Sequence, residues 1–147
     1  MFAVPEHTVL RPSPYRQIGI AALVRSVAAD PDRWRDLLRF APGHPVRVPL
    51  RSTDGDRAAS DAEVWLSGWL PGQRTPPHAH DERVQGAFAV VSGLLVERSW
   101  DRSRTLRPGQ VRVFGPGYRH SLLNAGLDPA VTVHVELPAR TVRVAVG

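Results

Sequence analysis

Cysteine is absent from the 147-residue sequence. Its absence excludes a disulfide framework, a thiolate metal site and a cysteine nucleophile. Any metal ion that this chain binds must therefore be held by nitrogen and oxygen ligands.

Lysine is absent as well, so all 19 basic residues are arginine. The formal net charge is +5 and the pI is about 11.1, a balance that raises nucleic acid or an anionic surface as a partner. The arginines are scattered along the chain and do not form a stripe with interleaved aromatic residues. A general compositional bias explains them more simply, and we expect no nucleic-acid partner.

Long apolar runs are also missing. No run approaches the length that crosses a bilayer, and the N-terminal residues lack the basic and apolar regions of a signal peptide. We expect no membrane partner and a cytoplasmic location. The length and the 42% hydrophobic content fit one globular domain over residues 1–147, as a monomer or a homodimer.

Helical periodicity is confined to residues 15–40. Residues 1–14 contain three prolines and predict an arm that lies on the surface or pairs at a sheet edge. From Tyr15 to Ala29, apolar residues at helical spacing predict an amphipathic helix: Ile20, Leu23, Val24 and Val27. Asp30 as cap and Pro31 at the first helical position predict a second short helix, with Trp34, Leu37 and Leu38 on one face.

Residues 45–147 change to short runs rich in Val, Leu, Phe and Trp, separated by turn residues. The expected strands are Val46–Arg51, Glu63–Leu70, Ala87–Val91, Leu94–Ser99, Gln110–Phe114, Val131–Leu137 and Thr141–Val146. Ser92-Gly93 suits a tight hairpin between two of them. The fold class is therefore mainly β, with a barrel after two short helices.

Histidines in two separate segments of the β region have an interpretable spacing. The first segment ends Pro76-Pro77-His78-Ala79-His80. In an extended strand, residues i and i+2 point to the same side, so His78 and His80 can offer two imidazoles to one ion. The second segment, Gly109 to Asn124, delivers His120 through a glycine-rich turn as a third ligand.

These two segments together resemble the paired motifs of the cupin superfamily. Gly72 to His80 matches the first motif, and Gly109 to Asn124 matches the second, except that Gly115 stands where proline is usual. The resemblance implies a jelly-roll barrel around one metal ion. The motif's usual glutamate is missing, because Gln85 or Gly86 occupies its place.

A three-histidine site without that carboxylate is similar to the thiol dioxygenases of the cysteine dioxygenase type. This likeness extends from about Ala29 to Pro138. It implies iron(II) as cofactor, dioxygen as co-substrate, and oxidation of a small thiol, such as cysteine or 3-mercaptopropionate, to a sulfinate. Three neutral imidazoles suit this reaction because the substrate thiolate supplies the negative charge.

The likeness also implies roles for residues on a late strand. The family's Ser-x-His-x-Tyr series is here Thr132-Val-His134-Val-Glu136, so these three residues are candidate catalytic residues, with glutamate in place of the tyrosine. Glu136 either forms a salt bridge in a divergent dioxygenase or acts as a base or cation-binding group. The second possibility leaves open a biosynthetic oxygenase or lyase. A small-molecule-binding barrel without catalysis is the third alternative.

An upstream arginine is expected to bind the substrate carboxylate, for which the guanidinium is well shaped. Arg47 and Arg51 lie four apart on one strand and compete for this role. Rough distance to Trp65 favours Arg51, and both being solvent-facing is the alternative. Pro49 between them indicates an edge strand or a bulge.

Overall fold

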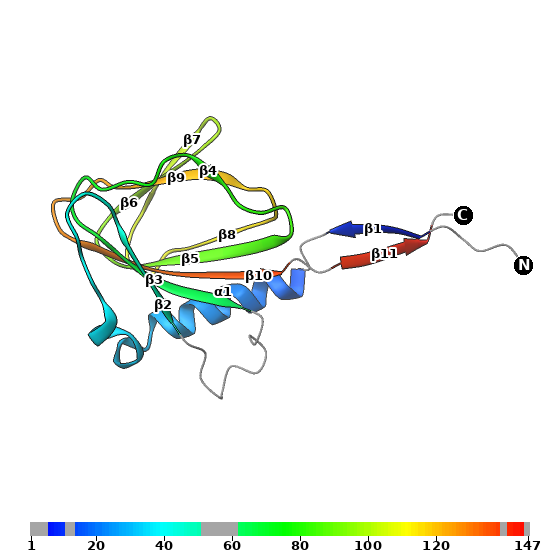
Figure 1. Cartoon of the computed structure of the whole chain (residues 1–147), viewed down its shortest axis with the longest axis horizontal. Coiled ribbons are helices and arrows are strands. Elements are labelled where there is room, and N and C mark those ends of the chain that lie inside the picture. The colour runs from blue at the N-terminus through cyan, green and yellow to red at the C-terminus, as the bar shows by residue number, and fades with distance from the viewer. Residues whose placement is uncertain (1–5, 11–13, 51–61, 139–140, 146–147) are drawn as a thin grey trace, which may run out of the picture.

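The computed structural model describes residues 6–10, 14–50, 62–138 and 141–145, and the side chains of residues 19–50 and 62–138. The expected mainly β fold is confirmed. Two antiparallel sheets face each other, and one helix covers the outer face of the larger sheet (Figure 1). No helix in the described ranges combines the length and apolarity needed to cross a membrane.

The larger sheet has the strand order β2-β3-β10-β5-β8. Its strands are β2 (Val46–Leu50), β3 (Glu63–Trp69), β10 (Ala130–Pro138), β5 (Val84–Ser92) and β8 (Val111–Phe114). β2 lies at the edge, which is where Pro49 is tolerated because an edge strand leaves its N–H positions partly unpaired.

The smaller sheet has the order β4-β9-β6-β7. Its strands are β4 (His78–Ala79), β9 (Arg119–Asn124), β6 (Leu95–Ser99) and β7 (Arg102–Leu106). The sequence did not predict β4, β7 or β9 as strands, since they are short or lack strict alternation. The predicted hairpin at Ser92-Gly93 is wrong, because β5 and β6 do not pair with each other and belong to different sheets. Gly93 lies in the turn that leads from one sheet to the other, and it has the positive φ of 83° that a glycine adopts at low cost.

Helix α1 (Pro14–Ala28) confirms the first predicted helix. Its residues Ile20, Val24 and Val27 are fully buried. They pack against β5 and β10 in one of two apolar clusters. The other cluster fills the space between the two sheets and includes Trp69, Phe88, Phe114 and Leu122.

The second predicted helix is wrong. The segment instead forms two 3-10 turns, η1 (Pro31–Arg33) and η2 (Arg35–Leu37). Asp30 makes no side-chain capping bond. Trp34 is buried and donates its indole N–H to the Val27 carbonyl oxygen at 2.8 Å. This contact draws the chain back onto the end of α1, where an α-helix would carry it away.

The predicted arm contains β1 (Glu6–Leu10), and the last predicted strand is β11 (Thr141–Ala145). They pair with each other as a separate two-stranded ribbon that extends beyond the barrel (Figure 1). β11 is therefore not a barrel strand, and the barrel ends with β10. The organisation of residues 1–147 as one domain stays a prediction.

Candidate metal centre

Two neighbouring strands bring the three predicted histidine ligands together. His78 on β4 lies directly opposite His120 on β9, and directly opposite residues of an antiparallel pair project from the same face. His80 follows β4, where its backbone N–H donates to the Tyr118 carbonyl oxygen at 2.8 Å. One ring nitrogen from each histidine lies within 4.8 Å of the others.

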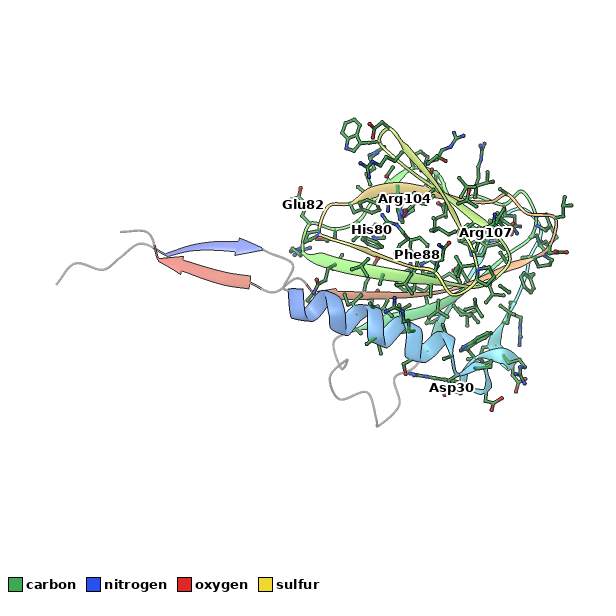
Figure 2. All side chains as sticks on the ribbon, turned by 180° about the vertical axis from the view of Figure 1, so that it is seen from behind. Asp30, His80, Glu82, Phe88, Arg104 and Arg107 are labelled. Atoms are coloured by element: carbon green, nitrogen blue, oxygen red, sulfur yellow. The ribbon has the colours of Figure 1, made fainter. Side chains whose placement is uncertain are left out.

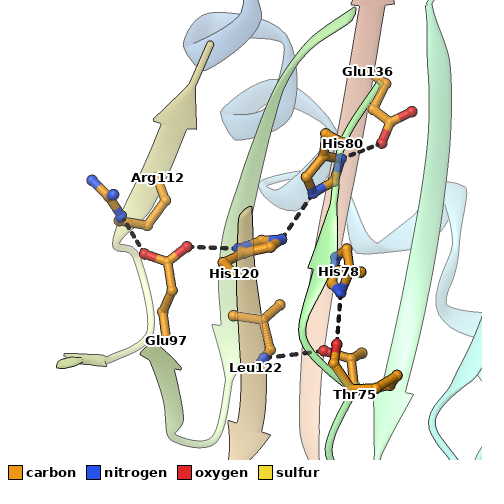
Figure 3. Close-up of polar contacts among 9 residues, drawn as sticks. Thr75, His78, His80, Glu97, Arg112, His120, Leu122 and Glu136 are labelled. Atoms are coloured by element: carbon orange, nitrogen blue, oxygen red, sulfur yellow. Dashed lines mark hydrogen bonds and ion pairs between the residues drawn. The ribbon is translucent and has the colours of Figure 1, made fainter. Parts of the chain in front are cut away.

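Each imidazole is held from behind through its Nδ1 atom (Figure 3). The acceptors are the Pro76 carbonyl oxygen for His78, Glu136 Oε1 for His80 and Glu97 Oε2 for His120, each at 2.9 Å. Carbonyl and carboxylate oxygens only accept, so each Nδ1 carries the hydrogen. A neutral imidazole bonded in this way keeps its lone pair on Nε2, the atom that binds a metal.

The Nε2 atoms of His80 and His120 lie 2.8 Å apart. Two lone pairs at this distance repel unless a positive species lies between or beside them. Burial lowers the pKa of His120, so a proton is disfavoured as the positive species between the two Nε2 atoms. The donor set therefore fits a divalent cation with imidazole preference, such as iron, zinc or copper.

Buried Glu97 and partly buried Arg112 form an ion pair behind His120. Glu97 is 1% exposed, and its Oε1 accepts from Arg112 Nε at 2.8 Å. Burial by itself would raise the pKa of Glu97, but the hydrogen bonds from His120 and Arg112 bring that pKa below its usual value. Glu97 is therefore ionised at neutral pH, which fixes the hydrogen on Nδ1 of His120.

Comparison with known proteins identifies this architecture. No family model matches the sequence, and no curated protein matches it. A double-stranded β-helix protein from Klebsiella pneumoniae is 24% identical, over 77% of this chain and 93% of that one, with a TM-score of 0.61. The Cupin_2 domain of an XRE family transcriptional regulator from Enterobacter cloacae is 23% identical, over 65% and 98%, with a TM-score of 0.56. The fold is that of a cupin.

An enzyme also shares the cupin fold with this chain. Oxalate oxidase in complex with glycolate is 20% identical, over 72% of this chain and 57% of that one, with a TM-score of 0.55. At these sequence identities the likeness shows that the folds are similar, and it does not show which reaction this chain catalyses.

The structure decides which residue stands in the cupin glutamate position. Gly86 lies on the face of β5 that looks into the barrel, because a Cβ placed on it would collide with the ring of Phe114. Gln85 projects to the opposite face, where its cross-strand neighbour Leu137 packs in the cluster under α1. The three-histidine cluster therefore has no carboxylate on β5.

A pocket of about 450 Å³ opens onto the three histidines. Its walls include side chains from β2, β3 and β10: Arg47, Trp65, Trp69, His134 and Glu136. Figure 2 shows His80 and Phe88 between the two sheets. The volume suits a small molecule.

His134 lies between two aromatic rings. The Trp65 ring stacks on it at 5.1 Å and the Phe88 ring at 5.5 Å. Burial in this apolar setting lowers the pKa of His134 to about 3. His134 is therefore a neutral wall of the pocket at physiological pH.

Thr132 is fully buried and contacts His134 instead of the pocket. Its Oγ1 accepts from Trp69 Nε1 at 2.9 Å and lies 2.7 Å from His134 Nε2. Since the indole only donates, Thr132 Oγ1 is the acceptor from Trp69, and the same oxygen forms a second hydrogen bond with Nε2 of His134. Thr132 thus positions His134.

Glu136 is close to the site but is not among the clustered ligands. Its Oε1 accepts from His80, and the side chain is 21% exposed at the pocket wall. Two of the three histidines are consequently backed by carboxylates. A carboxylate that accepts from a ligating imidazole raises its basicity and fixes its orientation.

The two predicted substrate arginines have different outcomes. Arg51 lies outside the described residues. Arg47 lines the pocket, with its guanidinium 3.7 Å above the Trp65 ring and a long, exposed ion pair of 3.8 Å to Glu63. Its role in binding a substrate carboxylate stays a prediction.

Three charged residues shape the site although the sequence pattern did not predict them. Arg74 lines the pocket just before the histidine pair, and Glu97 and Arg112 support His120. Glu97 could have been found, because it stands two residues after Leu95 on the inward side of a predicted strand, where a charge needs a partner. Arg74 lies in a stretch without periodicity and gives no such signal.

Proposed function

We propose that this cupin is a non-haem iron(II) thiol dioxygenase that oxidises a small, carboxylate-bearing thiol to a sulfinate. The observation that carries the proposal is the three-histidine cluster with Gly86, and no carboxylate, at the inward position of β5. Such a site leaves the anionic ligand to be supplied by the substrate. The oxalate oxidase fold likeness is compatible with an oxidoreductase.

The pocket residues would bind and orient the substrate. Arg47 is fixed against Trp65 and can form a bidentate contact with a carboxylate, and Arg74 lines the same pocket. Trp65 and neutral His134 would form an aromatic wall of the pocket, and Phe88 stacks on His134 from behind it. When bound, iron(II) would supply the redox centre at which the sulfur and dioxygen meet.

Proton handling would fall to Glu136. Its Oε1 is engaged by His80, and among the described residues no hydrogen bond engages Oε2. Oε2 can accept the thiol proton as the thiolate forms. In the overall reaction the sulfur loses four electrons, dioxygen gains them, and both oxygen atoms enter the sulfinate, so no external reductant is needed.

The proposal is tested with iron-loaded protein in an oxygen electrode. Cysteine and 3-mercaptopropionate are supplied in turn, and the product is analysed by mass spectrometry under ¹⁸O₂. We expect one dioxygen consumed per sulfinate, with both labelled atoms in the product. Arg47→Gln should raise KM more than it lowers kcat, while Arg107→Gln, on an exposed residue away from the pocket, should change neither. Iron-loaded protein that consumes no oxygen with any thiol would refute the proposal.

A second candidate function rests on the same carboxylate. Because Glu136 both contacts a predicted ligand and lines the pocket, it could serve as the base of a biosynthetic oxygenase or lyase. Glu136→Tyr separates the two candidates. A gain of thiol oxidation favours a divergent dioxygenase, and no gain favours other chemistry. A barrel that only binds small molecules would show no dependence of ligand binding on the three histidines.

A further inference from the structure

A second hollow lies on the outer face of the smaller sheet, and its volume of about 750 Å³ exceeds that of the metal pocket. On β9, buried His120 and Leu122 alternate with Arg119 and Ser121, which point outward. Six of its lining residues do not line the metal pocket: Pro77, Arg98, Ser99, Trp100, Arg119 and Ser121. The hollow and the metal pocket share a wall at Arg74, Thr75, Pro76 and His120.

The polar side chains of this outer hollow can nearly all donate hydrogen bonds. Arg74, Arg98 and Arg119 line it, and among the described residues none of these three forms an ion pair. Thr75, Ser99 and Ser121 add hydroxyl groups, and Thr75 Oγ1 already accepts from the Leu122 N–H, which leaves its own hydrogen free. Within the described part of the chain, no carboxylate side chain lines the hollow. This set of arginines and hydroxyl donors is suited to bind an anion.

Trp100 stands at the edge of the outer hollow with its side chain fully exposed. It lies in the turn between β6 and β7 and has a φ of 44°, the one positive value of a non-glycine residue among those described. Both the strained backbone and the exposed indole are unfavourable for the chain alone. An aromatic ligand stacked on the indole would offset the exposure.

We propose that the outer hollow binds a small anion attached to an aromatic ring, as in an aromatic carboxylate or an aryl phosphate. Arg98 and Arg119 bind the anionic group, and the ring stacks on Trp100. A small molecule is favoured over nucleic acid because the donors surround a hollow of ligand size and do not follow a long groove. This proposal is independent of the reaction at the metal centre.

Trp100 provides a direct measurement. The other three tryptophans are between 2% and 7% exposed, so iodide quenching of the fluorescence reports chiefly on Trp100. At low ionic strength, iodide should quench more strongly than neutral acrylamide, because the arginines attract it. Phenyl phosphate or benzoate should protect Trp100 from iodide, with at least tenfold tighter binding than inorganic phosphate or phenol.

Variants assign the effect to these residues. Arg98→Gln with Arg119→Gln should weaken binding of phenyl phosphate at least tenfold by calorimetry, and Trp100→Leu should remove the preference for the aryl anion over inorganic phosphate. Arg107→Gln is the matched control on an exposed arginine outside the hollow. His78→Ala should bind phenyl phosphate normally, which separates this site from the metal centre.

Absence of protection by every aryl anion, or binding unchanged in the double variant, would overturn the proposal. Much tighter binding of single-stranded oligonucleotides than of phenyl phosphate would overturn it in favour of nucleic acid.

Discussion

Glu136 on β10 lies directly opposite Gly86 on β5. The two positions share the face that looks into the barrel, and Gly86 holds the place where the cupin motif usually has its glutamate. A carboxylate is thus present near the usual position but comes from the neighbouring strand. From there it contacts Nδ1 of His80 and not the point where the Nε2 atoms converge.

We expect Gly86→Ala to destabilise the protein, because the added methyl group collides with the Phe114 ring. Overpacking of this kind costs about 1–3 kcal/mol in the free energy of unfolding. Combining it with Phe114→Leu should recover part of the loss, as urea denaturation would measure. Gly19→Ala is the control: it is exposed in α1 with no atom near the new Cβ, and it should be neutral or stabilising.

Loss of any one histidine of the cluster should abolish stable metal binding. His78→Ala, His80→Ala and His120→Ala each remove one of three convergent nitrogen ligands. Elemental analysis of the purified variants should show metal at background level. His44→Ala lines the same pocket outside the cluster and should retain full occupancy. Equal metal content in all four variants would mean that the ion binds elsewhere.

Glu97→Gln should weaken metal binding while leaving the fold intact. The amide keeps the size of the side chain but no longer provides the charged acceptor for Nδ1 of His120. Removing such a partner typically costs about 10–100-fold in metal affinity. A chelator competition titration measures this loss, and Glu82→Gln on the exposed loop after the histidine pair is the control. An unchanged metal affinity would show that Glu97 stabilises Arg112 and does not support metal binding by His120.

Stability should fall as the pH is lowered from 6.5 toward 4.5, in part because of His134. Its pKa is lowered from 6.5 to about 3 in the folded protein, so the unfolded chain takes up a proton that the folded chain refuses. Each such proton gives a slope of up to about 1.4 kcal/mol per pH unit. His134→Phe keeps a ring between Trp65 and Phe88. It should lower the slope of the unfolding free energy against pH by the contribution of one proton.

His134 and Glu97 affect the stability of the protein in different pH ranges. Glu97 has a lowered pKa, so its contribution is fully present above the usual value of 4.5 and is lost only as the pH falls through its folded value. Denaturant unfolding between pH 4.5 and 6.5 therefore isolates the histidines. Equal slopes in the wild type and His134→Phe would show that His134 can be protonated in the folded state.

The helix prediction shows where local patterns suffice and where they fail. Apolar spacing predicted α1, because Ile20, Val24 and Val27 fall on one helical face whatever they pack against. The same reasoning gave a second helix at Asp30, but burial of Trp34 against α1 turned that segment into 3-10 turns. In this segment the tertiary contact of Trp34 with α1 outweighed the local helix propensity.

The sequence by itself determined the mainly β fold and the three histidines of the cluster, because strand alternation and the His-x-His spacing are local properties of the chain. Only the tertiary structure decided between Gln85 and Gly86, since a shift of one residue reverses the face of a strand. It also decided which acceptors hold each imidazole. Glu97 and Glu136 reach His120 and His80 across 23 and 56 residues of sequence. Over such separations pairing depends on sheet register and not on local pattern, as it does for the contact of Arg112 with Glu97.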